Sequence, residues 1–289
     1  MKEKIRNLVI WLVASLFFQG LVYLYLDQFL LAPASAYEVS AVAGPTGGGK
    51  AYYSRDRRYT AVVKHEAVEI YAARKKEPVR TISLRGKTVT YFKWLEDRDL
   101  ALMGMAEETS GSGRVILAQI HPQGAVHELA ETIGDLPKGS RITNVAYSTA
   151  TNVIYMAIQV AANPEQYRVY RTDANHDLKR VYLNASRIGR MAVLYEEDWL
   201  VYDDLAKGTV VIRHGDGSWD IVSPPAGKYR LIGVDAQDTI YIARLNGEGM
   251  ATAVLAGKSK GKFSEERVYQ TPRDIQQITV KELGKTVRQ

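Results

Sequence analysis

The chain has 289 residues, of which 46% are hydrophobic and 24% charged, and its formal net charge is +6. This is the composition of an ordinary globular protein, and the length suffices for one large domain or two small ones. The sequence contains no cysteine, which excludes disulfide cross-links, thiol catalysis and cysteine-ligated metal sites.

The N-terminal region contains a long apolar run. Residues 8–26 read LVIWLVASLFFQGLVYLYL, without a charged side chain. At about 1.5 Å per residue, a helix of this length just spans a hydrocarbon core of about 30 Å. The preceding residues 1–7 carry two lysines and an arginine, and basic residues tend to stay in the cytoplasm. We therefore expect a cytoplasmic tail over 1–7, a transmembrane signal anchor over 8–26 and an extracytoplasmic remainder at the cell membrane.

A cleaved signal peptide is the alternative interpretation of this region. Residues 34–36 read ASA, and small residues of this kind form cleavage sites. The apolar run is longer than the usual signal-peptide core of about 7–15 residues, which favours the uncleaved anchor. Both interpretations export the rest of the chain.

A glycine-rich stretch follows the apolar run. Residues 44–51 read GPTGGGKA, which matches the phosphate-binding pattern G-x-x-x-x-G-K through Lys50. The next residue is Ala51, whereas that pattern requires a Ser or Thr that ligates Mg²⁺ and begins a helix. The residues beyond it have the pattern of a strand and a turn. We therefore interpret 27–49 as a linker and expect no nucleotide among the partners or cofactors.

The positive charge is gathered in short clusters such as RDRR at 55–58 and KSKGK at 258–262. Such clusters suit anionic surfaces, although solvated hairpin tips are the simpler interpretation. No basic strip is interleaved with aromatic residues, so the sequence does not indicate a nucleic-acid partner.

Beyond residue 50, short segments rich in Val, Ile, Tyr and Thr alternate with turn residues. Segments such as YTAVV, NVIYMAI and TIYIARL have the alternation of strands, and NGEG and PPAGK have turn chemistry. The pattern predicts an all-β domain over residues 50–289.

The strands repeat as a set. Corresponding strands begin at Tyr59, Leu100, Val153, Leu200 and Thr239, spaced by 39 to 53 residues. Each follows a polar turn and precedes a second strand and a hairpin, and a period near 40–45 residues with four strands is typical of a β-propeller. We expect five blades, one of which residues 37–44 or 275–283 could complete by closing the ring, and a sixth, diverged blade is left open.

The first repeat, residues 53–82, resembles one blade of the TolB-type, WD-like propeller repeats. Its matches to that pattern are Tyr53, Ser54, Asp56, Tyr59 and Ala61. Arg55 stands where the pattern has proline, and Arg57 where it has glycine. The resemblance covers about residues 50–270 and implies the fold seen in the propeller of dipeptidyl peptidase IV, without that protein's hydrolase domain.

Motifs for known chemistries are weak. TSGSGR at 109–114 lacks the order of a G-x-S-x-G nucleophile elbow, and the five histidines form no close ligand pair. DANHD at 173–177 begins like an EF-hand loop, but Leu178 and Asn184 stand where the glycine and the closing glutamate belong. We interpret it as a polar hairpin loop and expect no catalytic, metal or cofactor residues.

The sequence thus favours a membrane-anchored, non-catalytic binding or scaffold module for a protein or cell-envelope partner. The alternative is a propeller enzyme, of lyase or lactonase type, with a polar site at the central channel. For binding, we expect turn residues that precede corresponding strands and emerge on one face. These are Arg55, Arg57, Arg58, Asp97 and Arg98.

Overall fold

The computed structural model describes residues 48–108, 111–124 and 130–284, together with Asn7, Trp11, Ser15 and Gln19. The chain divides into two compact units, residues 1–46 and 47–289. Within the described part of the chain, no helix is long and apolar enough to cross a membrane. Apart from Asn7, Trp11, Ser15 and Gln19, the expected tail and anchor lie outside the described residues, as does most of the linker. The transmembrane helix therefore has no support in the structure, and the domain boundaries and membrane location stay predictions.

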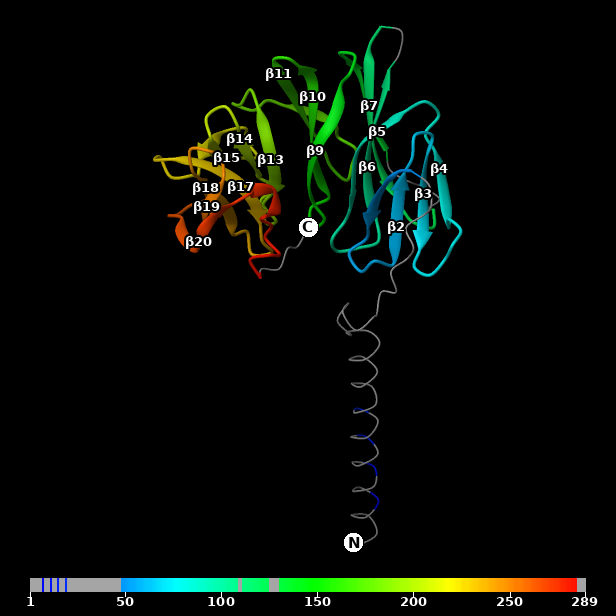
Figure 1. Cartoon of the computed structure of the whole chain (residues 1–289), viewed down its shortest axis with the longest axis horizontal. Helices are drawn as coiled ribbons and strands as arrows, with labels where there is room; N and C mark the ends of the chain where they lie inside the picture. The colour runs from blue at the N-terminus through cyan, green and yellow to red at the C-terminus, as the bar shows by residue number, and fades with distance from the viewer. Residues whose placement is uncertain are drawn as a thin grey trace. The chain divides into compact units, whose positions relative to one another are not determined.

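The second unit contains five four-stranded antiparallel sheets, here called A to E, each built from consecutive strands (Figure 1). Sheet A contains β1 (Lys50–Tyr53), β2 (Tyr59–Val63), β3 (Ala67–Ala72) and β4 (Arg80–Ser83). Sheet B contains β5 (Thr88–Trp94), β6 (Ala101–Glu108), β7 (Gly113–Ile120) and β8 (Ala130–Leu136). Sheet C contains β9 (Arg141–Ser148), β10 (Val153–Ala162), β11 (Glu165–Thr172) and β12 (Lys179–Val181). Sheet D contains β13 (Ile188–Val193), β14 (Leu200–Asp204), β15 (Thr209–Arg213) and β16 (Trp219–Ile221). Sheet E contains β17 (Lys228–Val234), β18 (Ile240–Leu245), β19 (Ala251–Gly257) and β20 (Ser264–Arg273).

The predicted all-β class and the repeat are confirmed. The strands that the sequence aligned are β2, β6, β10, β14 and β18, the second strand of every sheet. Lys50 begins β1 and is followed by strand, so the glycine-rich stretch leads into a sheet and not into a helix.

Adjacent sheets pack face to face through buried apolar side chains. One core cluster joins sheets A and B around Ile70 and Met103, and another joins B and C around Leu102 and Met156. Further clusters join C to D and D to E. Because fully burying one such side chain stabilises the fold by about 1.5–3 kcal/mol, this packing holds the sheets in sequence.

A buried carboxylate ties sheet D to sheet E. Asp203 on β14 is 1% exposed, and its two oxygens accept the backbone N–H groups of Arg190 (3.0 Å) and Leu231 (2.5 Å). Gly189 makes room for this arrangement, since a Cβ there would lie 2.7 Å from the Asp203 Oδ2 atom. Burial raises the pKa of Asp203 to about 6, although the two backbone N–H groups lower it.

The C-terminal segment packs on sheet E and reaches other sheets. Ile278 and Val280 are buried in a cluster with Tyr241 and Val254 of sheet E. The Arg190 guanidinium on β13 donates to the carbonyls of Ile275 (2.8 Å) and Ile278 (3.1 Å).

This segment does not complete a blade. It contains the short 3-10 helix η3 (Ile275–Gln277) and turns, so the expectation that residues 275–283 add a strand is wrong. The other candidate, residues 37–44, lies outside the described residues. Five sheets are present in the described part of the chain.

Candidate functional site

A pocket of about 240 Å³ lies between sheets B and C. Leu117 and Ile154 contribute apolar surface to it, from β7 and β10 respectively. Glu131 lines it from β8, and Thr172 and His176 line it from the end of β11 and the turn that follows. A cavity with apolar walls and a few converging polar groups is the usual form of a small-molecule site.

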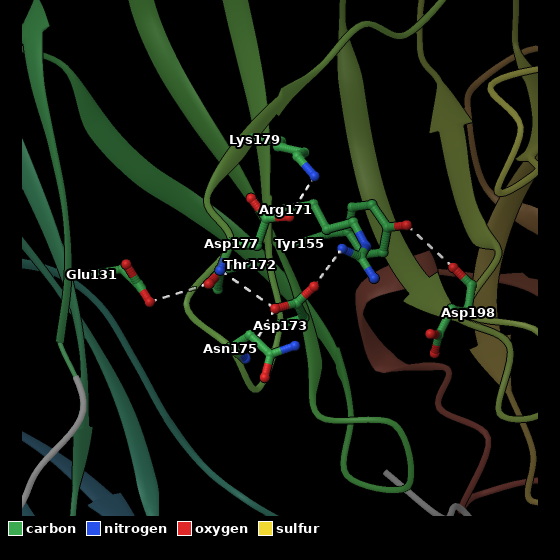
Figure 2. A network of polar contacts seen from close by, with 9 residues as sticks. All are labelled: Glu131, Tyr155, Arg171, Thr172, Asp173, Asn175, Asp177, Lys179 and Asp198. Atoms are coloured by element: carbon green, nitrogen blue, oxygen red, sulfur yellow. Dashed lines mark hydrogen bonds and ion pairs between the residues drawn. The ribbon is translucent and has the colours of Figure 1, made fainter.

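Glu131 is the polar centre of this pocket. Its Oε1 atom lies 2.5 Å from His176 Nδ1 and accepts a hydrogen bond of 3.1 Å from the Thr172 hydroxyl. The Glu131 side chain is 16% exposed and the His176 side chain 45% exposed. Figure 2 shows Glu131 directed from its own strand toward Thr172 of the neighbouring sheet. Glu131 is therefore held in place by its surroundings, whereas His176 is open to a ligand.

The turn that carries His176 is built by Asp173. The Asp173 carboxylate accepts the backbone N–H groups of Asn175 (3.0 Å) and Asp177 (3.3 Å) and pairs with Arg171 at 3.1 Å (Figure 2). These bonds, that from Asn175 first, lower the pKa of Asp173. The predicted hairpin loop is thus confirmed. The carboxylate that would begin a Ca²⁺ loop is engaged in shaping the turn, and the described residues hold no group of three or more His, Asp or Glu suited to a metal.

The Glu131–His176 contact fixes the chemistry available to the imidazole. A carboxylate oxygen that accepts from Nδ1 favours the neutral tautomer with the proton on Nδ1, which leaves the lone pair on Nε2. A histidine in this tautomer can remove a proton from a ligand, and the adjacent carboxylate stabilises the imidazolium that forms.

A second, smaller pocket of about 70 Å³ adjoins the first. Gln119, Asn152 and Ile154 line both pockets, so the two form one cleft along the boundary between sheets B and C. Arg98, from the β5–β6 turn, and Tyr147 and Ser148, at the end of β9, line the smaller pocket.

The histidines share a position that the sequence did not reveal. His121, His176 and His214 each lie in the connection between the third and fourth strands of sheets B, C and D. In an antiparallel sheet that connection emerges at the same end as the turn between the first and second strands. Three residues that are distant in sequence therefore occur on the same side of their sheets, a regularity visible only after the repeats are aligned strand by strand.

The predicted binding residues lie in the β1–β2 and β5–β6 turns, which link the first two strands of sheets A and B. An ion pair of 2.8 Å between Arg58 and Asp99 joins the two turns, so the structure brings them together. Arg58 also pairs with Asp56, and Arg98 with Asp97. Of the five predicted residues, Arg98 lines the smaller pocket. Whether the others, Arg55, Arg57, Arg58 and Asp97, bind anything stays a prediction.

Comparisons with known proteins identify relatives by structure only. No protein-family model matches the sequence, and neither does the sequence of any curated protein. The solved structure of a catalytically inactive variant of virginiamycin B lyase from Staphylococcus aureus, with quinupristin, matches with a TM-score of 0.50 and 12% identity. The match covers 80% of this chain and 73% of that one.

Two further solved structures are similar at lower scores. A streptogramin B lyase matches with a TM-score of 0.48 and 12% identity, over 80% of this chain and 72% of that one. A luciferin-regenerating enzyme matches with a TM-score of 0.46 and 10% identity, over 75% of this chain and 74% of that one.

These findings correct the functional expectation. The sequence favoured a non-catalytic binding or scaffold module, and that interpretation is contradicted by the similarity in fold to virginiamycin B lyase, which is an enzyme. The finer TolB-type, WD-like assignment is not confirmed by any of the matches. At 12% identity the similarity to virginiamycin B lyase shows the fold alone, and the described part of this chain forms five sheets with the fold of a β-propeller.

Proposed function

We propose that this protein is an enzyme that uses the Glu131–His176 pair as a general acid–base device in the pocket between sheets B and C. The 2.5 Å contact between the carboxylate and the imidazole at the wall of a 240 Å³ pocket carries the proposal. General acid–base catalysis by a positioned side chain accelerates reactions by about 10²–10⁴-fold.

The reaction class that we propose is elimination. His176 Nε2 removes a proton from the carbon next to a substrate carbonyl group. The electron pair of that C–H bond forms a carbon–carbon double bond, and the group on the neighbouring carbon departs with its bonding electrons. The imidazolium then returns its proton to the departing group, so no external oxidant or reductant is required.

The role of Glu131 is to position and stabilise the base. Its carboxylate holds Nδ1–H and therefore orients Nε2, and it stabilises the positive charge that His176 acquires. Thr172 donates a hydrogen bond to the same carboxylate oxygen from the neighbouring sheet. The similarity in fold to virginiamycin B lyase, of which a histidine-to-alanine variant is catalytically inactive, supports this choice of reaction class.

We place the site between sheets B and C, not at the centre of the sheets. The C-terminal segment lies against the first strands of sheets D and E, because Arg190 donates to Ile278 and Gly233 approaches Val280. Lys281, in the same segment, forms an ion pair of 2.7 Å with Glu96 in the β5–β6 turn of sheet B. We therefore propose the boundary between sheets B and C, which holds the pocket, in place of the central channel expected from the sequence.

The proposal is tested by incubating the full-length protein with quinupristin and with small β-acyloxy carboxylic acids. Mass spectrometry then detects the unsaturated elimination product. We expect His176→Ala and Glu131→Gln to lower the rate by about 10²–10⁴-fold. His65→Ala is the matched control, because His65 lies in the β2–β3 turn at the other end of its sheet. Absence of turnover on every substrate, or full activity of His176→Ala, would overturn the proposal.

A further inference from the structure

We infer that the smaller pocket beside the Glu131–His176 pair is a carboxylate-binding subsite, so that the substrate is a carboxylic acid. The inference rests on the proposed function and names its substrate class. It is carried by the pocket's position, its hydrogen-bond donors, its local charge and its size.

Position connects the subsite to the reacting groups. Gln119, Asn152 and Ile154 line both pockets. A ligand held in the smaller pocket therefore extends directly into the larger one, where His176 lies. A carboxylate bound in the smaller pocket places its neighbouring carbon atom toward His176 in the larger pocket.

Donors in the smaller pocket lack an acceptor. Ser148 is 3% exposed and Tyr147 is 4% exposed, and neither hydroxyl group donates a hydrogen bond to another of the described residues. Burial raises the pKa of Tyr147 above its usual value, so its hydroxyl keeps the proton and remains a donor. Leaving buried polar groups unsatisfied is costly, and an anionic ligand oxygen would satisfy both hydroxyl groups.

Two cationic side chains lie at or near the smaller pocket. Arg98 lines the pocket, and Asp97 accepts from two of its donors, at 2.8 and 3.1 Å. A guanidinium has five donors, so others remain for a ligand. The Lys93 ammonium lies 5.4 Å from the centre of the Tyr147 ring.

Further charged groups surround Tyr147. Lys93 interacts electrostatically with Glu96 and with Lys281, which themselves form an ion pair. Around Tyr147 there are therefore three cations and two anions once Arg98 and Asp97 are included.

Size limits the ligand group. The smaller pocket has a volume of about 70 Å³, which accommodates a planar carboxylate group. The same donors would stabilise the negative charge that moves onto the carboxylate when His176 removes the neighbouring proton.

Binding is measured without turnover by heteronuclear NMR of the full-length protein. The probes are sodium propionate and, as the uncharged comparison, propionamide. We expect propionate to shift resonances of the smaller pocket saturably and propionamide to bind at least about tenfold more weakly, since a charge-assisted hydrogen bond is about twice as strong as a neutral one. Arg98→Gln and Ser148→Ala should each weaken propionate binding by about tenfold.

Two control variants separate this inference from the proposed function. Arg55→Gln changes an arginine in the β1–β2 turn and should leave propionate binding unaltered. His176→Ala should also retain it, because His176 belongs to the larger pocket. Propionate binding without turnover on any substrate would overturn the proposed function alone. Absence of propionate binding, equal binding of propionamide, or full binding by Arg98→Gln would overturn the subsite alone.

Discussion

Two buried or half-buried carboxylates lie between neighbouring sheets of this protein, and they are held in opposite ways. Asp203, between sheets D and E, accepts from two backbone N–H groups and is sealed from solvent. Glu131, between sheets B and C, contacts two side chains, one of them a histidine, at the wall of a pocket. Backbone donors cannot change protonation state, whereas an imidazole can, so the first arrangement suits stability and the second suits chemistry.

The largest expected effect is on stability at the D–E boundary. Asp203→Ala removes the acceptor of two buried backbone N–H groups, each of which costs about 1–3 kcal/mol when unsatisfied. We expect the free energy of unfolding to fall by about 2–5 kcal/mol, measured by urea denaturation. Asp220→Ala, at a carboxylate that is 74% exposed, is the control and should stay within about 1 kcal/mol. Equal losses for both variants would contradict the distinction.

A second effect concerns pH. The pKa of Asp203 in the folded protein is raised to about 6 from its ordinary value of 3.8, so the folded state binds this proton more tightly than the unfolded state. Its contribution to stability is therefore fully present below about pH 4 and is lost as the pH rises through about 6. Urea denaturation of the wild type and of Asp203→Asn between pH 4 and 8 should show that the variant lacks this component. A parallel pH dependence in both proteins would argue against it.

The smallest expected effect on stability is at Glu131. Glu131→Gln keeps the size of the side chain and the Thr172 contact, and the half-exposed His176 can be solvated in place of its lost partner. We expect a change in unfolding free energy below about 1 kcal/mol, together with the loss of turnover proposed above. A stability loss as large as that of Asp203→Ala would make Glu131 a structural residue and remove the contrast between the two boundaries.

The sequence carried much of the fold. Strands beginning near Tyr59, Val153 and Leu200 were predictable because each has period-2 alternation after a polar turn. The first strands were harder to recognise. β5, β9 and β13 contain Lys93, Asn144 and Arg190, which interrupt the apolar pattern.

The candidate site was beyond sequence reasoning. His176 was visible inside DANHD, and its turn was predicted, but Glu131 is 45 residues away in another sheet. Their contact depends on how β8 and the β11–β12 turn are placed side by side, which is set by the packing between sheets. Arg98 was predicted as a binding residue of a turn. Tyr147 and Ser148 were not, because in the sequence they look like ordinary strand residues.

The C-terminal segment affects the order in which contacts form during folding. Each sheet consists of consecutive strands, so the five can form one after another as the chain is synthesised. Arg190 of sheet D is different, because the carbonyl groups that accept its two shorter hydrogen bonds, those of Ile275 and Ile278, lie 85 and 88 residues later in the chain. Glu96 of sheet B forms its ion pair with Lys281, which lies 185 residues later. Contacts of such wide separation form late and slowly, so sheet B obtains this partner only after sheets C, D and E have been synthesised.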